Sequence, residues 1–192
     1  MDEPTADSVV AGKRLLVGVG GGVAAYKTCE LVSRLAQRGA SVVVLMTDAA
    51  TRFVAPLTFE ALSGQRPVVS LWEQTASHDP QHIRLAREAD AAVVAPATMD
   101  LLARLACGLT SDPVTLTLSA VDRHRQPVLL APAMNETMWR QPATQRAVAQ
   151  LREDGFLLEG PEEGWQACRT VGVGRMAEPL RILASLERLL QR

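Results

Sequence analysis

Short runs of consecutive apolar residues recur along the chain, and segments with helical periodicity separate them. Strands that are apolar on both faces belong in a parallel sheet covered by helices on both sides, so the pattern predicts one α/β domain. The predicted strands are residues 14–19, 41–46, 68–72, 91–95 and 128–131, with a possible edge strand at 156–159. The predicted helices are residues 23–37, 56–64, 98–107, 112–120, 143–152 and 179–190. Gly39 is expected to end the first helix in the left-handed conformation that glycine adopts easily.

Charge and cysteine content indicate which partners and which cellular compartment to expect for this domain. The net charge is −1 with both signs scattered, so no basic face suggests a nucleic acid or an anionic membrane as partner. No apolar run approaches membrane length, and the acidic start is not a signal peptide. Cys29, Cys107 and Cys168 are far apart and form neither a metal-binding pair nor a disulfide framework. We therefore expect a cytoplasmic protein without a metal, in which residues 1–12 are a disordered lead and residues 13–192 form the domain.

The first predicted strand leads into a glycine-rich loop, residues 18–25 (GVGGGVAA). The loop contains the pattern G-x-G-x-x-A, whose glycines let the backbone approach a phosphate at a helix N-terminus. A dinucleotide site would place Asp or Glu at the end of the second strand, where Thr47 stands instead, followed by Asp48. A hydroxyl suits a terminal phosphate better than a ribose, which favours a mononucleotide such as FMN over NAD. The alternative is a glycine-rich turn without a ligand.

An unusual octapeptide, residues 132–139 (PAMNETMW), directly follows the predicted strand 128–131. Ligands of parallel sheets bind beyond the carboxyl ends of the strands, which is where this loop would lie. Its amide, thioethers and indole suit a flat, partly polar ligand, because Met adapts its shape and Asn both donates and accepts. The alternative is an ordinary turn, with Asn135 as a helix cap and Met138 in the core.

Further motifs accompany the octapeptide in a fixed order. They are residues 21–27 (GGVAAYK), 47–53 (TDAATRF), 56–64 (PLTFEALSG), 82–83 (HI), 96–101 (PATMDL), 167–168 (AC) and 172–176 (GVGRM). The set resembles the flavin-containing cysteine decarboxylases. That family includes phosphopantothenoylcysteine decarboxylase of coenzyme A synthesis and the peptidyl-cysteine decarboxylases of lantibiotic-type peptide maturation. The resemblance covers residues 13 to 185, and the octapeptide matches the family motif P-x-M-N-x-x-M-W at every fixed position.

The resemblance implies a flavodoxin-like (Rossmann-like) three-layer sandwich with a parallel sheet. It also implies homotrimers, in some cases grouped into homododecamers, with FMN at a subunit interface. The family reaction begins with a cysteine that has a free thiol and a free carboxylate. Flavin oxidises the Cβ–S unit to a thioaldehyde, and loss of carbon dioxide then leaves an enethiolate.

Residue roles carry over from the family to matching positions. His82 would accept the thiol proton, Cys168 would return a proton to the enethiol, and Asn135 and Met138 would contact substrate. Residues 160–178 resemble a segment that closes over the substrate as a lid. The positions expected to hold FMN are Gly20, Gly21, Gly22, Val23, Thr47, Phe53, Ala97, Thr98, Asp112 and Met134. The alternatives are a helix-start histidine without a role, a buried Cys168, and Asp112 as a plain helix cap.

Three residues near the expected substrate depart from the family pattern. Asp100 replaces an Asn that holds the substrate carboxylate, and Leu101 removes a hydroxyl. An ionised Asp100 would repel that carboxylate unless a cation intervenes or Asp100 is protonated. Arg169 stands where the coenzyme A enzymes commonly have Gly, and it could meet a carboxylate or a phosphate.

Two substrates compete on these grounds. The departures, and the end of the chain just after the decarboxylase domain, favour the C-terminal cysteine of a ribosomally made precursor peptide, as in thioamide- or lantibiotic-type maturation. Cys168 and residues 174–176 favour phosphopantothenoylcysteine as the alternative. A non-catalytic, phosphatase-regulating relative is a further alternative.

Overall fold

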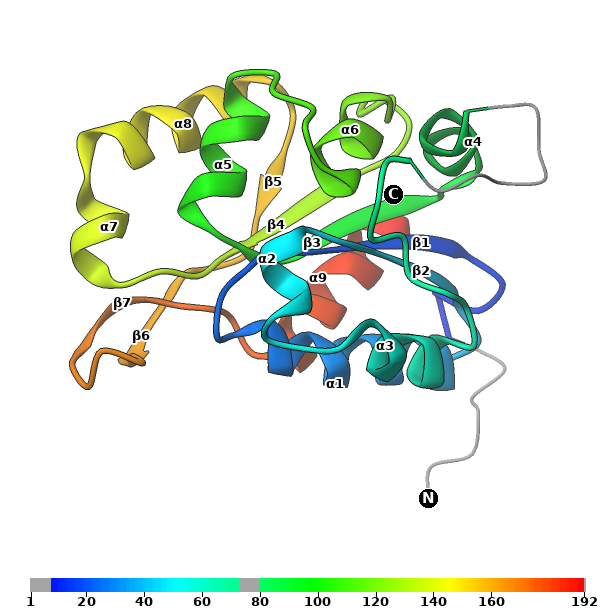
Figure 1. Cartoon of the computed structure of the whole chain (residues 1–192), viewed down its shortest axis with the longest axis horizontal. Coiled ribbons are helices and arrows are strands. Elements are labelled where there is room, and N and C mark those ends of the chain that lie inside the picture. Colours follow the sequence, from blue (N-terminus) through cyan, green and yellow to red (C-terminus); the bar gives the residue numbers. More distant parts are fainter. Residues whose placement is uncertain (1–7, 73–79, 192) are drawn as a thin grey trace.

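A parallel sheet of five strands forms the centre of the computed structural model, which describes residues 8–72 and 80–191 (Figure 1). Its strand order is β2-β1-β3-β4-β5, and every neighbouring pair is parallel. The strands are β1 (Arg14–Val19), β2 (Ser41–Met46), β3 (Ala91–Ala97), β4 (Val128–Pro132) and β5 (Leu157–Leu158). The predicted α/β fold with a flavodoxin-like, three-layer arrangement is confirmed.

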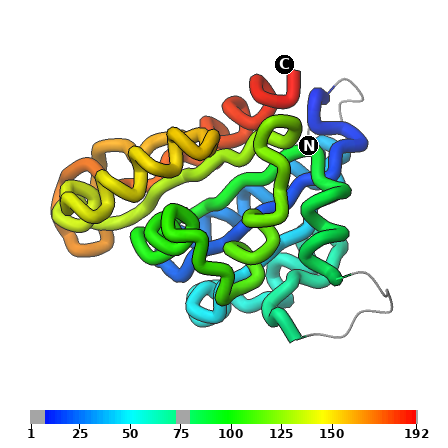
Figure 2. Tube along the Cα trace, turned by 90° about the horizontal axis from the view of Figure 1, so that it is seen from above, coloured from blue at the N-terminus to red at the C-terminus, as the bar shows by residue number. Residues whose placement is uncertain are grey.

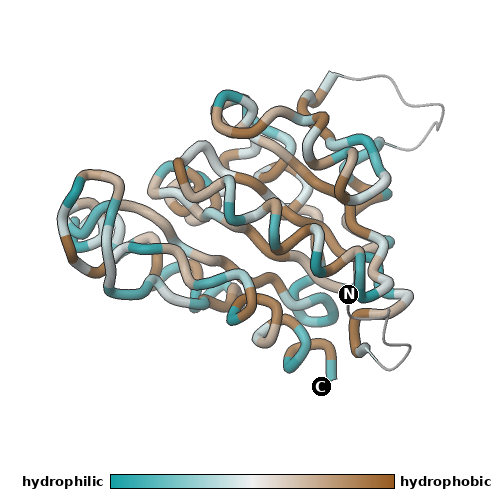
Figure 3. The backbone as a smooth tube through the Cα atoms, turned by 90° about the horizontal axis from the view of Figure 1, so that it is seen from below, coloured by the Kyte–Doolittle hydropathy of each residue, from teal (hydrophilic) through white to brown (hydrophobic). Residues whose placement is uncertain are grey.

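Helices cover both faces of the sheet, as the apolar strands predict (Figure 2). One face carries α1 (Ala25–Gln37), α3 (Pro56–Ser63) and α9 (Pro179–Leu190). The other carries α4 (Gln81–Glu88), α5 (Met99–Ala106), α6 (Pro113–Ser119) and α8 (Pro142–Glu153). Along β1, Leu15 and Val17 face the first layer while Leu16 faces the second. The chain is accordingly apolar along its central strands and polar on the outer helix turns (Figure 3).

Local signals in the sequence explain how these elements end. Helix α1 buries Leu31, Val32 and Leu35 on one face, and Gly39 follows it with φ of 83°, as predicted. Two short helices, α2 (Asp48–Thr51) and α7 (Glu136–Arg140), begin shortly after the carboxyl ends of β2 and β4. In the described ranges, no helix is both long and apolar enough to span a bilayer.

The prediction of a strand at 68–72 is wrong. Only Val68 pairs with β2, by a single bridge to Leu45, and the chain then turns away, with the Trp72 N–H bonded to Ser70 Oγ at 3.1 Å. Trp72 is 89% exposed, so this segment lacks the burial expected of a continuous apolar strand. The disordered lead is also wrong for residues 8–12, because they form turns and Val10 is fully buried against the first layer. Residues 1–7 lie outside the described part.

The expected lid contains regular structure that the sequence pattern did not predict. Strands β6 (Glu162–Trp165) and β7 (Val171–Arg175) form an antiparallel hairpin, separate from the main sheet. The hairpin lies beside α7 at one end of the molecule (Figure 1), and the Met134 N–H donates to the Gly174 carbonyl at 2.9 Å. The hairpin is therefore docked on the octapeptide.

Candidate functional site

Four of the predicted site residues are N-caps of helices that begin at the carboxyl edge of the sheet. Each side-chain oxygen accepts a backbone N–H two or three residues on, which satisfies a donor that the helix cannot. Thr47 caps α2 (3.1 Å to Ala50 N), Thr98 caps α5 (3.3 Å to Leu101 N), Asp112 caps α6 (2.9 Å to Val114 N) and Asn135 caps α7 (2.8 Å to Met138 N). These loops are therefore fixed without a ligand.

Helix α1 differs, because it has no side-chain cap and no acidic residue in its first turn. The loop before it consists of Gly20 to Ala24, and within the described residues the N–H groups of Gly21 and Val23 donate to no protein acceptor. Unpaired N–H groups at a helix N-terminus attract a phosphate. This end of α1 therefore fits the terminal phosphate of FMN, and it is where the sequence places the phosphate loop.

The glycines of this loop are also needed for packing inside the protein. A Cβ on Gly20 would lie 2.5 Å from the Pro96 carbonyl oxygen, and one on Gly21 would lie 2.3 Å from Ala49 Cβ. At Gly22 the nearest atom, Thr98 Cγ2, would be 3.4 Å away, which is ordinary contact. Gly20 and Gly21 thus bring the β1, β2 and β3 loops together, and Gly22 keeps the surface of the loop open.

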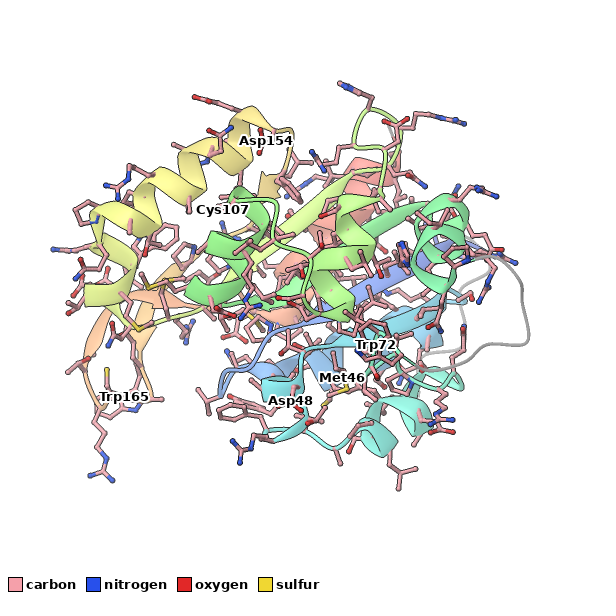
Figure 4. All side chains as sticks on the ribbon, turned by 45° about the horizontal axis from the view of Figure 1, so that its top comes forward. Met46, Asp48, Trp72, Cys107, Asp154 and Trp165 are labelled. Atoms are coloured by element: carbon pink, nitrogen blue, oxygen red, sulfur yellow. The ribbon has the colours of Figure 1, made fainter. Side chains whose placement is uncertain are left out.

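The other positions expected to hold FMN lie around these loops. Val23 and Phe53 are more than half exposed, and Thr47 is buried. Ala97 is fully buried at the end of β3, and Met134 is half-buried at the start of the octapeptide. Figure 4 shows Asp48 where α2 follows β2.

The cap formed by Asn135 determines which of its atoms can reach a ligand. Its Oδ1 accepts the Met138 N–H, so the Nδ2 amide points elsewhere and can only donate. A donor without a negative charge is suited to hold a carboxylate. Met138 is 40% exposed, so it is available for contact and is not a core residue.

Asp100 is paired with a cation, which bears on the repulsion expected from its charge. Arg104, one turn later on α5, donates from Nε to Asp100 Oδ2 at 2.9 Å and from Nη1 to Ser111 Oγ. The Asp100 side chain is 68% exposed. Arg104 is not among the predicted site residues, although its i,i+4 spacing from Asp100 is a readable signal.

Cys168 lies in the turn of the β6–β7 hairpin. Its side chain is exposed, so the alternative of a buried small hydrophobe does not hold. Its Sγ is 3.0 Å from Thr170 Oγ1 and 3.6 Å from Gln166 Oε1. Arg169, beside it, is exposed and has φ of 65°, an uncommon value for a residue with a side chain. Gln166 was also missed, because a buried glutamine gives no sequence signal.

His82 lies apart from Cys168, the other predicted catalytic residue. It stands in the first turn of α4, which packs against α6. Figures 1 and 2 show α4 and α7 at opposite ends of the molecule. One chain therefore brings Asn135 and Cys168 together but does not bring His82 to them.

Comparison with known proteins identifies the class to which this fold and site belong. The family model described as Flavoprotein matches residues 5–191. The chain therefore belongs to the flavoprotein family.

Among solved structures it is similar to the FMN-dependent cysteine decarboxylase SpaF, with 29% identity and a TM-score of 0.81 over 95% of this chain and 99% of that one. A cysteine-to-serine mutant of a PPC decarboxylase, complexed with pantothenoylaminoethenethiol, gives 30% identity and a TM-score of 0.82 over 94% and 99%. Within the family, the chain is accordingly a member of the flavin-dependent cysteine decarboxylases.

Curated relatives are more similar to this chain in sequence than these solved structures are. The coenzyme A biosynthesis bifunctional protein CoaBC of Vibrio vulnificus is 46% identical over 182 residues, which are 95% of this chain and 45% of that protein. CoaBC of Bacillus subtilis is 42% identical over 176 residues, or 92% and 43%. The chain thus spans less than half the length of these relatives.

The expectation of a peptide substrate is wrong. Identities of 42–47% to CoaBC proteins favour the coenzyme A alternative, whereas the cysteine decarboxylase TvaF from thioviridamide biosynthesis is 27% identical. The expectation relied on Asp100, Leu101 and Arg169 as departures from the family pattern and on the end of the chain. Arg104 pairs with the charge of Asp100, so Asp100 does not argue against a phosphopantothenoyl substrate.

Proposed function

We propose that this domain is an FMN-dependent decarboxylase that converts phosphopantothenoylcysteine into the corresponding saturated thiol. The observation that carries the proposal is the docking of the β6–β7 hairpin on the octapeptide through Met134 and Gly174. This contact supports the proposal because Cys168, which would donate the proton, is carried on that hairpin, and Asn135, whose amide would hold the carboxylate, belongs to that octapeptide. An enzyme that both decarboxylates a cysteine and saturates its product needs these two groups on one substrate.

The chain's own residues would bind substrate and move protons. Asn135 Nδ2 would hold the carboxylate until carbon dioxide leaves, and Cys168 would give a proton to the enethiol carbon. His82 would accept the substrate thiol proton. Bound FMN would supply a two-electron oxidant whose electrons return later in the same turnover, so the overall reaction is redox-neutral.

FMN would bind at the uncapped end of α1. The Gly21 and Val23 N–H groups would hold its phosphate, with Thr47, Thr98 and Asp112 fixing the neighbouring loops. Gly22, Phe53, Ala97 and Met134 would lie along the rest of the cofactor.

The site would be completed by a second copy of the chain. The separation of His82 from Cys168 supports this, since the two residues would act on one substrate. Exposed apolar side chains near the N-terminus of α1 also support an oligomer, because such groups mark interaction surfaces. They are Val23, Tyr26, Phe53 and Leu57, each 53–71% exposed. We propose a homotrimer, with the hairpin covering the substrate as its lid and with the reducing cytoplasm as its location.

The experiment is incubation of the purified flavoprotein with phosphopantothenoylcysteine under anaerobic conditions. Mass spectrometry should find a product that is lighter than the substrate by the mass of carbon dioxide alone, with no further loss of hydrogen. A protein that binds FMN but releases no carbon dioxide would instead match the non-catalytic alternative. The Asn135→Asp variant provides the site-specific control described below.

A further inference from the structure

Gln166 is a buried residue at the base of an exposed turn. Its side chain is 7% exposed, whereas residues 167–170 after it are all exposed. Its backbone N–H donates to the Thr170 carbonyl and its carbonyl accepts from the Arg169 N–H, both at 2.9 Å. Gln166 therefore closes the turn that carries Cys168.

The side-chain oxygen of Gln166 serves two donors. Its Oε1 accepts the Glu136 N–H at 3.2 Å and the Cys168 thiol at 3.6 Å from Sγ. An amide oxygen has two lone pairs, so it can accept both at once. Thr170 Oγ1 lies 3.0 Å from the same sulfur. Cys168 Sγ is thus held between Gln166 and Thr170.

The second donor connects the hairpin to the octapeptide. Glu136 is the first residue of α7, so its N–H has no partner within the helix. Gln166 supplies that partner, one residue after Asn135. A single amide oxygen therefore joins the thiol of Cys168 to the backbone that carries the substrate-binding amide.

The other half of the Gln166 amide has no such partners. Its Nε2 is buried and has no hydrogen-bond partner in the described structure. A Cβ added to Gly174 would lie 3.0 Å from this nitrogen. A buried donor without a partner is destabilising, because it has lost its hydrogen bonds to water. An apolar side chain of similar length, such as Met, would fill the space without that cost. The two donors that Oε1 accepts, the Glu136 N–H and the Cys168 thiol, explain why an amide stands at this position.

We propose that Gln166 is a positioning residue for the saturation step, which fixes the Cys168 thiol relative to substrate held by Asn135. The inference rests on the proposed function. In that step the enethiol C=C bond would become a single bond by gaining a hydride (two electrons and one proton), which bound reduced flavin would supply, and a second proton. Cys168 gives one of these protons to carbon, and its thiolate is reprotonated from solvent. Decarboxylation precedes this step and does not require Cys168.

The test compares the two products that leave the enzyme, the enethiol and the saturated thiol, which differ by two hydrogens. Gln166→Met removes the acceptor and keeps the volume. The enethiol fraction should rise about fivefold, as expected for loss of one hydrogen bond, while carbon dioxide release stays within about twofold. Glu163→Met, at an exposed position of the same hairpin, is the matched control and should keep the wild-type product ratio.

A second variant keeps the inference testable if Gln166→Met does not fold. Gln166→Asn retains the amide but is one methylene shorter, so its oxygen cannot reach both donors, and it should also release enethiol. An unchanged product ratio in a folded Gln166 variant, while Cys168→Ser releases enethiol, would overturn the role of Gln166. Failure of the wild-type protein to release carbon dioxide would instead refute the proposed function.

Discussion

At the scale of single residues, Asn135 performs two tasks with different atoms. Its Oδ1 caps α7 and its Nδ2 is the donor proposed to hold substrate. Asn135→Asp keeps an oxygen for the cap and replaces the donor with a negative charge. We expect kcat/KM to fall by at least about 10- to 100-fold, since a hydrogen bond to a charged group contributes about 1.5–3 kcal/mol.

Thermal unfolding separates the two tasks of Asn135. The Asp variant should keep its Tm within about 1–2 °C, whereas Asn135→Ala should lose about 0.5–2 kcal/mol of stability together with the cap. Full activity in Asn135→Asp would show that this amide does not hold the carboxylate.

The three cysteines should differ in reactivity. Burial raises the pKa of the Cys29 thiol, which lies on α1 and is half-buried, so less of it is thiolate at a given pH. Cys107 and Cys168 are exposed. We expect iodoacetamide at pH 8 to modify Cys29 last, as followed by peptide mass mapping. Modification of Cys29 before both others in folded protein would contradict this order.

The sequence identified the types of site residues better than their atomic roles. Thr47, Thr98, Asp112 and Asn135 are all polar residues at strand ends, and a cap and a ligand site require the same residue types there. Which oxygen is used by the cap depends on the backbone path after the strand. Asp100 is paired with Arg104, and their i,i+4 spacing makes this ion pair readable once the helix is predicted.

At the scale of elements, strands buried on both faces were predictable and the hairpin was not. After Arg14 and Ser41, their polar first residues, β1 and β2 are apolar, and β3 and β4 are apolar over their whole length, which is a strong signal. Strands β6 and β7 contain Gly164, Gly172 and Gly174 and alternate weakly. Their pairing depends on docking against α7, which local sequence does not encode.

The base of the hairpin should be sensitive to acid. Lys27 on α1 pairs with Glu178 at 2.8 Å, and this hydrogen bond is the main reason that the pKa of Glu178 lies below its usual 4.5. Since folding lowers this pKa, the pair contributes stability above about pH 4.5, and the contribution is lost as the pH falls below it. The pair is partly exposed, so its contribution is about 0.5 kcal/mol.

Glu178→Gln should therefore lower Tm by about 1–2 °C at pH 7 and have no effect near pH 3. Differential scanning calorimetry at both pH values checks this. Glu163→Gln is the control, because Glu163 is exposed and forms no ion pair in the described structure. A Glu178→Gln effect that grows toward low pH would contradict the assignment.

At the scale of the whole molecule, the proposed site needs residues from two copies. His82→Gln and Cys168→Ser should each be defective as pure oligomers in forming the saturated thiol. When the two variants are unfolded and refolded together, about a quarter of the sites in randomly mixed rings should carry both intact residues. The saturated thiol should then form at about that fraction of the wild-type rate.

Refolding each variant alone provides the matched control, since it reproduces the procedure without mixing chains. Saturated product no greater in the mixture than in the separate samples would mean that His82 and Cys168 act within one chain. That outcome would require α4 to approach the hairpin, which lies at the other end of the molecule.

The self-capped loops at the carboxyl edge have a consequence for how such proteins diversify. Thr47, Thr98, Asp112 and Asn135 each close a loop with a side chain of that loop, so neighbouring positions such as Asp48 or Asp100 can mutate without unfolding it. Natural selection can then alter what the edge recognises while the scaffold stays intact. Such tolerance would allow one architecture to persist among proteins named as a PPC decarboxylase, as SpaF and as HAL3, which are 29–30% identical to this chain.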